Sequence, residues 1–299
     1  MLSAQAASAG NVLEEVIWVP QVGVQWKKLD FEQALPDPGS SEGDVLEGSL
    51  DANVPSMVVS FTGIYKKAYV SFKYEDSLDN VSTDSDVPGT NGPTDTERKD
   101  FSITVGYNVW DRLNVFAGYL EGETKLRPDP TCPADLPGGV QVDNPDCGRD
   151  PALGAGPQRT LNGNLAQDHF VNQQAGFPVS AYKQEYKEDG WFLGASYGWR
   201  LMDTGTLSVS LAYADLDATY TDNYLVGTGF PDVYDYDGNA DGFSYGINWS
   251  QPLSEKVGYY LDLRTQQYEA DLEDQTGAFL DVENEEKITA FTAGIQLYL

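Results

Sequence analysis

Few side chains in this sequence have the type and spacing needed for metal chemistry, and the best-spaced set is a run of aspartates. Asp235, Asp237 and Asp241 lie at near-alternate positions around Gly238 in the segment DVYDYDGNADG. Oxygen ligands at such spacing can chelate Ca²⁺. The bidentate glutamate that follows the central glycine of a calcium loop is absent, so a solvated acidic turn is the preferred interpretation and the three aspartates remain a minor metal candidate.

The composition excludes several classes of function. The chain has 299 residues with 47 acidic and 18 basic side chains, one histidine, two cysteines and a net charge of −29. Nucleic-acid binding is not expected, because phosphate contacts need clustered Lys and Arg. A Cys/His zinc or iron–sulfur site lacks ligands. No stretch approaches the roughly 18 apolar residues of a membrane-spanning helix.

The elements that must position any site are strands, because apolar residues recur with a period of two. Phe101, Ile103, Val105 and Tyr107 alternate with Ser102, Thr104, Gly106 and Asn108, and the same alternation runs through residues 191–200, 242–250 and 257–264. One face of each segment is apolar and aromatic, and the other is small, polar or charged.

Ten such segments are expected, and their connections alternate in length. The segments are 16–29, 54–65, 66–76, 99–110, 112–125, 183–201, 205–220, 239–251, 256–271 and 286–299. Short turns follow every second segment, whereas the long links are 32–52, 77–97, 126–182, 221–238 and 272–285. This order predicts an up-and-down antiparallel meander with all long loops at one end.

Such strands could form a soluble barrel with the apolar face inside or a transmembrane barrel with that face against lipid. The second is favoured, because Trp191, Trp199 and Trp249 stand at the ends of apolar faces, as interfacial aromatic girdles require. The Gly- and Ser-rich opposite face suits a crowded interior. An even number of strands, about ten, allows the closure that a bilayer demands.

The final strand supplies a resemblance. Thr292, Gly294, Leu297 and Leu299 occupy the places of the C-terminal assembly signal of bacterial outer-membrane β-barrels, with Leu299 where that class usually has Phe. The resemblance implies an outer-membrane location, short periplasmic turns and long extracellular loops. It also implies outer-membrane lipid, lipopolysaccharide and the barrel-assembly machinery as partners.

The resemblance leaves residues 11–299 as one barrel domain. Residues 1–10 are expected to be a signal-peptide remnant or a flexible N-terminus, because Ala7-Ser8-Ala9 has the form that signal peptidase cuts after. In the oxidising environment implied for loop 126–182, Cys132 and Cys147 are expected to form a disulfide. It would stabilise the loop by roughly 3 kcal/mol in the chain-entropy model. Two free thiols are the alternative.

Most acidic residues are assigned to the long loops. They serve either general solubility or the binding of Ca²⁺ or Mg²⁺ that bridges to lipopolysaccharide. No other cofactor is expected. An extracellular partner held by the long loops is a further possibility.

Catalysis has little support. Outer-membrane proteases of the omptin family are ten-stranded barrels that use an Asp-x-His pair on one strand face. Here the only histidine, His169, directly follows Asp168. Adjacent strand residues point to opposite faces, so the omptin pattern is not met and no enzymatic activity is expected.

The charges predicted to face the lumen are Lys27, Lys73, Glu75, Arg200, Asp262 and Arg264. In a narrow ten-stranded barrel they either pair across the lumen and brace its wall or line a small polar conduit. The preferred function is therefore a non-enzymatic surface-interaction or structural role. The alternatives are a narrow channel for small solutes or ions and, third, an omptin-like surface protease.

Overall fold

The computed structural model describes residues 16–36, 45–85, 92–128, 183–201, 204–223, 233–275 and 281–299. Within these ranges the regular secondary structure is β-strand, and no helix is long and apolar enough to cross a membrane. The strands are β1 (Ile17–Pro36), β2 (Val45–Tyr65), β3 (Ala68–Ser77), β4 (Val81–Ser85), β5 (Gly92–Asn108), β6 (Leu113–Pro128), β7 (Lys183–Leu201), β8 (Gly205–Asn223), β9 (Val233–Pro252), β10 (Val257–Asp274) and β11 (Val282–Leu297).

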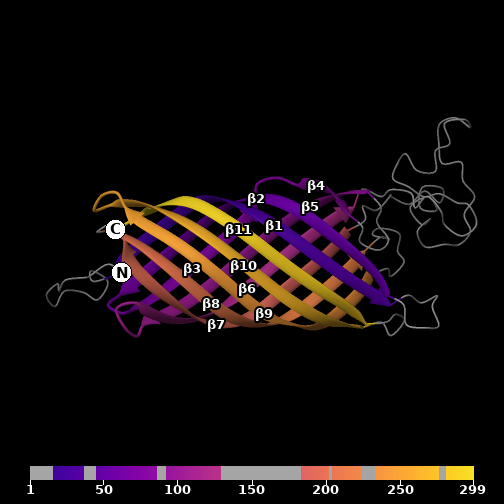
Figure 1. Cartoon of the computed structure of the whole chain (residues 1–299). Helices are drawn as coiled ribbons and strands as arrows, with labels where there is room; N and C mark the ends of the chain where they lie inside the picture. Colours follow the sequence, from indigo (N-terminus) through magenta and orange to yellow (C-terminus); the bar gives the residue numbers. More distant parts are fainter. Residues whose placement is uncertain are drawn as a thin grey trace, which may run out of the picture.

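The strands form one closed antiparallel barrel (Figure 1). Strand β1 pairs with β2 on one side and with β11 on the other, which closes the sheet. Both β3 and β4 lie between β2 and β5, so together they fill one place in the wall. The result is a ten-place up-and-down barrel, as the alternating segments predict.

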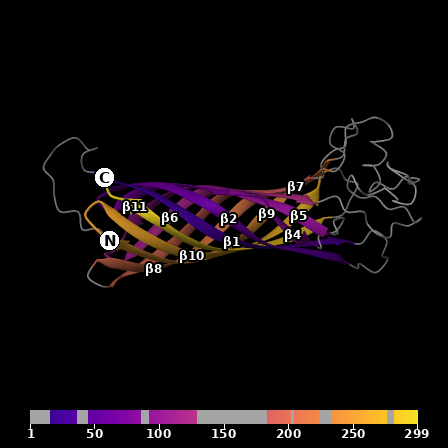
Figure 2. The same ribbon diagram turned by 90° about the horizontal axis from the view of Figure 1, so that it is seen from above.

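Both ends of the barrel sequence meet at the same end of the cylinder. The Trp18 amide donates to the Leu299 carbonyl at 3.2 Å, and the Leu299 amide donates to the Trp18 carbonyl at 2.9 Å. The short link at Lys66–Lys67 lies at this end, and Figure 2 shows the elongated cylinder that extends away from it. We call this the turn end and the opposite one the loop end.

An apolar band surrounds the half of the barrel nearer the turn end. On β1 the side chains of Val22, Val24 and Trp26 point outward, and Trp26 is 56% exposed. Outward rows of the same kind run along the other strands, for example from Trp191 to Trp199 on β7. These outward apolar side chains are stable in contact with lipid rather than with water. The predicted outward-facing apolar rows are confirmed.

The predicted loop boundaries are wrong at the loop end, because the strands continue past the apolar band. Link 32–52 shrinks to residues 37–44 between β1 and β2, and β9 begins at Val233 inside the predicted link 221–238. Strand β11 likewise begins at Val282 inside the predicted link 272–285. We call the parts of the strands beyond the apolar band the distal extension. Many acidic residues assigned to loops are therefore strand residues.

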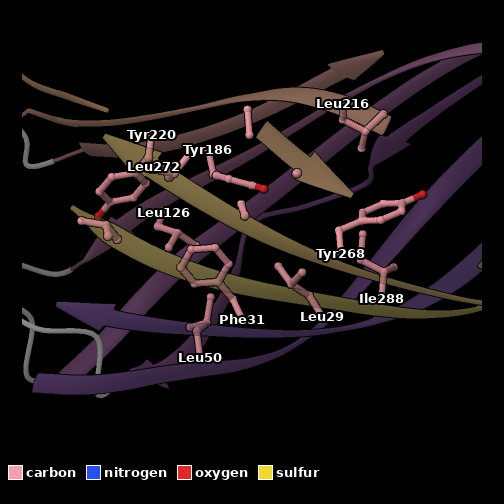
Figure 3. Close-up of a cluster of buried hydrophobic side chains, with 14 of the residues drawn as sticks. Leu29, Phe31, Leu50, Leu126, Tyr186, Leu216, Tyr220, Tyr268, Leu272 and Ile288 are labelled. Atoms are coloured by element: carbon pink, nitrogen blue, oxygen red, sulfur yellow. The ribbon is translucent and has the colours of Figure 1, made fainter. Parts of the chain in front are cut away.

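The polarity of the wall inverts in the distal extension. On β1, Lys28, Asp30 and Glu32 point outward, whereas Leu29 and Phe31 point into the lumen and are at most 1% exposed. Figure 3 shows the resulting core, in which apolar side chains from many strands converge on the barrel axis. In the apolar band the barrel is thus apolar outside and polar inside. In the distal extension it is polar outside and apolar inside.

Candidate functional site

The lumen has three levels, and each follows from the inward-facing residues of the strands. Nearest the turn end is a cavity of about 450 Å³ lined by hydroxyl and amide side chains, including Ser208, Ser210, Ser244 and Asn248. Next comes a cluster of buried charges. Beyond it lies the apolar core of the distal extension.

Three of the predicted lumen charges meet in the buried cluster. Lys27 of β1 forms ion pairs with Glu75, at 2.5 Å, and with Asp100. Lys73 pairs with Glu75 from the same strand. Lys27 of β1 thus pairs with carboxylates on β3 and β5, two strands that do not neighbour β1, and the predicted pairing across the lumen is found for Lys27 and Glu75.

Arg98 is the centre of the cluster, and the sequence analysis missed it. Its guanidinium contacts Glu188 of β7 at 2.6 Å, Glu286 of β11 at 2.6 Å and Asp100 at 2.8 Å, and donates to the hydroxyl of Thr124 at 2.8 Å. Arg98, Glu188 and Glu286 are each at most 2% exposed. One side chain therefore ties together four strands around the barrel.

The two glutamates have incomplete hydrogen bonding. In the described part of the chain, Oε2 of Glu188 and Oε2 of Glu286 are buried and lack hydrogen-bond partners. Glu188 lies in the distal extension, outside the membrane-spanning band, and burial raises its pKa to about 8. Protonation of Glu188 would leave three cations, Lys27, Lys73 and Arg98, opposite three carboxylates. The cluster can thus be neutral when it holds one proton.

Asp262 and Arg264 also face the lumen, as predicted. Both line the 450 Å³ cavity from β10. Asn248 Nδ2 donates to Asp262 Oδ2 at 3.4 Å. Arg200 differs from the prediction: it has the inward parity on β7, yet it is exposed because it stands next to the last residue of the strand at the turn end. It does not line the lumen cavity.

The outer wall of the distal extension carries carboxylates in direct register. Asp215 of β8 pairs with Asp241 of β9, Asp241 with Glu269 of β10, Glu269 with Glu285 of β11, and Glu285 with Glu32 of β1. We call these five residues the acidic ladder. A groove of about 700 Å³ crosses it, lined in part by Glu32, Glu269 and Glu285. Like charges directly opposite each other in a sheet are destabilising.

The minor metal candidate is corrected by this register. Asp235, Asp237 and Asp241 lie on the extended strand β9, not in a turn, and all three are exposed. Asp235 and Asp241 are six residues apart, which is ~20 Å along a strand. One ion cannot contact both. Within the described ranges, no group of three or more His, Cys, Asp or Glu side chains could hold a metal ion.

The four residues that resemble an assembly signal have the alternating orientation that the pattern predicts, and their role as a signal stays a prediction. Thr292 faces inward and accepts a hydrogen bond from Gln25 at 2.9 Å, while Leu297 and Leu299 are exposed outside. Gly294 makes room for Tyr260: a Cβ at this position would lie 2.5 Å from Tyr260 Cε1. Glycine is therefore required where the aromatic ring covers the wall.

Several predicted residues lie outside the described residues. These are Cys132 and Cys147, His169, and most of the predicted loop 126–182, of which only residues 126–128 belong to the described end of β6. The predicted disulfide and the reading of His169 as a loop residue stay predictions.

Among solved structures, one outer-membrane barrel has a similar fold, and others have lower similarity. The outer membrane protease OmpT from Escherichia coli has a TM-score of 0.59 and 11% identity, over 95% of this chain and 97% of that one. Ail of Yersinia pestis has a TM-score of 0.34 and 7% identity, over 95% and 99% of the two chains. The toluene transporter TodX of Pseudomonas putida has a TM-score of 0.32 and 10% identity, over 94% and 89%.

No family model matches the chain, and no curated protein matches it. The likeness to OmpT shows a fold in common and says nothing of activity. The fold is that of bacterial outer-membrane β-barrels, and the apolar outer band is what an outer-membrane location requires. Both the predicted class and the predicted location are confirmed.

Proposed function

We propose that this protein is a non-enzymatic surface-interaction barrel, closed to solutes, whose distal extension holds an acidic outer wall at the cell surface. The observation that carries the proposal is the inversion of polarity. Apolar side chains such as Phe31 and Leu50 fill the lumen of the distal extension, and the acidic ladder occupies its outside. The carboxylates of the acidic ladder repel one another in the isolated protein. A cationic partner would neutralise this charge and remove the repulsion.

The partner that fits this wall carries positive charge. The ladder begins close to the apolar band, since Tyr213 of the band donates to Asp241 at 3.4 Å. It would thus lie near the phosphate groups of the outer leaflet. Divalent cations shared between these carboxylates and lipopolysaccharide phosphates are the chemistry that we favour.

On the opposite side of the distal extension, lysines neutralise part of the negative charge, although Glu121, Asp189 and Asp217 also lie in direct register. There Lys125 pairs with Glu123 at 2.5 Å, and Lys187 pairs with Glu123 at 3.4 Å and with Glu185. These carboxylates are already neutralised by lysines on β6 and β7. Glu123 is therefore expected to respond less to added cations than the carboxylates of the ladder, which have no ion pair among the described residues.

The test of the acidic wall compares two variants in vesicles that contain lipopolysaccharide. We expect Mg²⁺ to raise the melting temperature of the wild type, and the double variant Glu269→Gln, Glu285→Gln to lose most of that increase. Glu123→Gln is the matched control and should keep it. An equal response to Mg²⁺ in all three proteins would refute the acidic wall as the interaction surface.

Closure is tested by conductance in planar bilayers. The wild type is expected to give no channel steps. A variant in which residues 129–182 are replaced by a short Gly/Ser linker should also give none, because the core and charge cluster fill the lumen. Steps in the wild type that change in Arg264→Ala would instead support the narrow channel.

The proposal includes the absence of catalysis. Incubation with a peptide library is expected to leave it intact. If the purified wild type cleaves the library and His169→Ala does not, the protease alternative is supported and the non-enzymatic proposal is refuted.

A further inference from the structure

The lumen cavity near the turn end has the size and lining of a binding site. Its volume of about 450 Å³ lies within the roughly 300–1,000 Å³ of small-molecule pockets. Serine hydroxyls line much of it, including those of Ser102, Ser208, Ser210 and Ser244. Such a lining offers donors and acceptors to a polar ligand, beside apolar side chains such as Phe116 and Phe192.

Most inward charges around this cavity neutralise one another. Glu75 is paired with Lys27 and Lys73, and Glu188 is paired with Arg98. Asp100 is paired with both Lys27 and Arg98. After these pairs are counted, the inward-facing charges that remain at the cavity are those of Asp262 and Arg264, while Glu121, which also lines it, is exposed.

Within the part of the chain that the structure describes, Asp262 and Arg264 are not joined by an ion pair, and neither forms an ion pair with another side chain. Arg264 has no hydrogen bond there, and Asp262 accepts only the 3.4 Å contact from Asn248. The two residues are alternate on β10, ~7 Å apart along the strand. An arginine presents five donors, and leaving them unused beside a cavity is unfavourable.

A third polar group on the same strand face is also unsatisfied. Tyr260, which also lines the cavity, is 6% exposed, and its hydroxyl lacks a hydrogen-bond partner among the described residues. Buried hydroxyls are nearly always hydrogen-bonded. One wall of the cavity thus carries a row of three polar groups from β10. They are the unsatisfied hydroxyl of Tyr260, the carboxylate of Asp262 and the guanidinium of Arg264.

We propose that this cavity binds a small zwitterion of the amino-acid class. The ligand carboxylate accepts hydrogen bonds from the Arg264 guanidinium, and the ligand ammonium pairs with the Asp262 carboxylate. The serine lining hydrogen-bonds the remaining polar atoms. A ligand with one charge of each sign leaves the cavity neutral, whereas a simple anion or cation leaves one protein charge uncompensated.

The cavity is closed on the side that faces the loop end. The charge cluster around Arg98 and the apolar core beyond it separate the cavity from the distal extension. The ligand would enter from the turn end, which is the periplasmic side in the orientation implied by the resemblance. The inference concerns binding and goes beyond the proposed surface role, so conductance and Mg²⁺ data do not decide it.

The test is isothermal titration of the purified full chain in nanodiscs with three matched compounds. L-serine carries both charges, N-acetyl-L-serine lacks the ammonium and L-serinamide lacks the carboxylate. We expect L-serine to bind about 10- to 100-fold more tightly than either capped compound, the range for losing hydrogen bonds to a charged group.

Two variants separate the roles of the charges. Arg264→Gln should bind L-serine no better than L-serinamide, and Asp262→Asn should bind it no better than N-acetyl-L-serine. Arg200→Gln, an arginine of the same parity outside the cavity, is the control and should bind L-serine as the wild type does. Heat-modifiable gel mobility verifies that each variant is folded. No saturable binding of L-serine, equal affinity for the three compounds, or unchanged selectivity in both cavity variants would overturn the proposal.

Discussion

Trp26 and Leu29 are three residues apart on β1, and their side chains point to opposite sides of the barrel wall. Trp26 is 56% exposed and stacks on Phe291 with ring centroids 6.1 Å apart, whereas Leu29 is 1% exposed inside. An odd spacing on a strand reverses the facing of a side chain. The apolar row thus changes sides between these residues, and the barrel passes there from a membrane wall to the wall of a soluble-type core.

The core of the distal extension should contribute to stability as a soluble core does. Phe31→Ala removes a fully buried ring and is expected to lower the free energy of unfolding by about 3–5 kcal/mol. Phe291→Ala is the matched control: lipid chains can occupy its space, so its loss should be smaller. Urea unfolding followed by tryptophan fluorescence measures both. Equal losses would contradict a packed core.

Arg98 should be needed because it neutralises buried carboxylates. Arg98→Met leaves Glu188 and Glu286 without their cation and should cost about 3–5 kcal/mol of unfolding free energy. Adding Glu188→Gln and Glu286→Gln to Arg98→Met removes those charges and should restore a large part of the loss. The urea midpoints of the single and triple variants report this, and a triple variant no more stable than the single one would speak against the account.

The raised pKa of Glu188 makes stability depend on pH. Its folded-state pKa of about 8 lies above the ordinary value of 4.5. Between these values the folded protein holds a proton that the unfolded chain releases, so stability falls as pH rises from about 5 to 8. Glu188→Gln should weaken this dependence. Melting temperatures at pH 5.5 and 8 test it, and an identical pH slope in wild type and variant would exclude Glu188 as the cause.

The acidic ladder should make stability depend on salt. Screening weakens repulsion between exposed like charges, so NaCl is expected to raise the melting temperature of the wild type. Glu285→Gln should raise it at low salt by relieving repulsion from Glu32 and Glu269, each pair contributing roughly 0.2–1 kcal/mol. Glu123→Gln breaks contacts to lysines and should give no such gain. A stabilisation by Glu123→Gln of similar size would argue against the ladder.

The sequence was sufficient to predict the barrel, its outward apolar rows and part of the lumen. Facing parity correctly brought Lys27, Lys73 and Glu75 inside, because alternation in the band is strict. Parity alone assigned Arg200 to the lumen, although the predicted segment 183–201 already placed it next to the strand end, where an inward residue meets solvent. Facing parity says which side of the wall a residue takes but not whether the lumen is closed at that level.

The distal extension was missed for a physical reason. Lys28, Asp30 and Glu32 have the composition of a loop, and a search for lipid-facing strands stops where outward residues become charged. Alternation itself continues, with Leu29 and Phe31 between them. Attention to the period instead of the polarity would have extended the strands and brought Arg98 into consideration.

Cysteine scanning along β1 tests the inversion most directly, in a background with Cys132→Ser and Cys147→Ser. Single cysteines at positions 22 to 33 are probed in vesicles with a membrane-impermeant maleimide and with a lipid-soluble quencher of an attached fluorophore. Cysteines replacing Val22, Val24 and Trp26 should respond to the lipid probe. Those replacing Lys28, Asp30 and Glu32 should react with the aqueous probe, and those replacing Leu29 and Phe31 should react with neither. Fast aqueous labelling at positions 29 and 31 would show that the lumen of the distal extension is open to water.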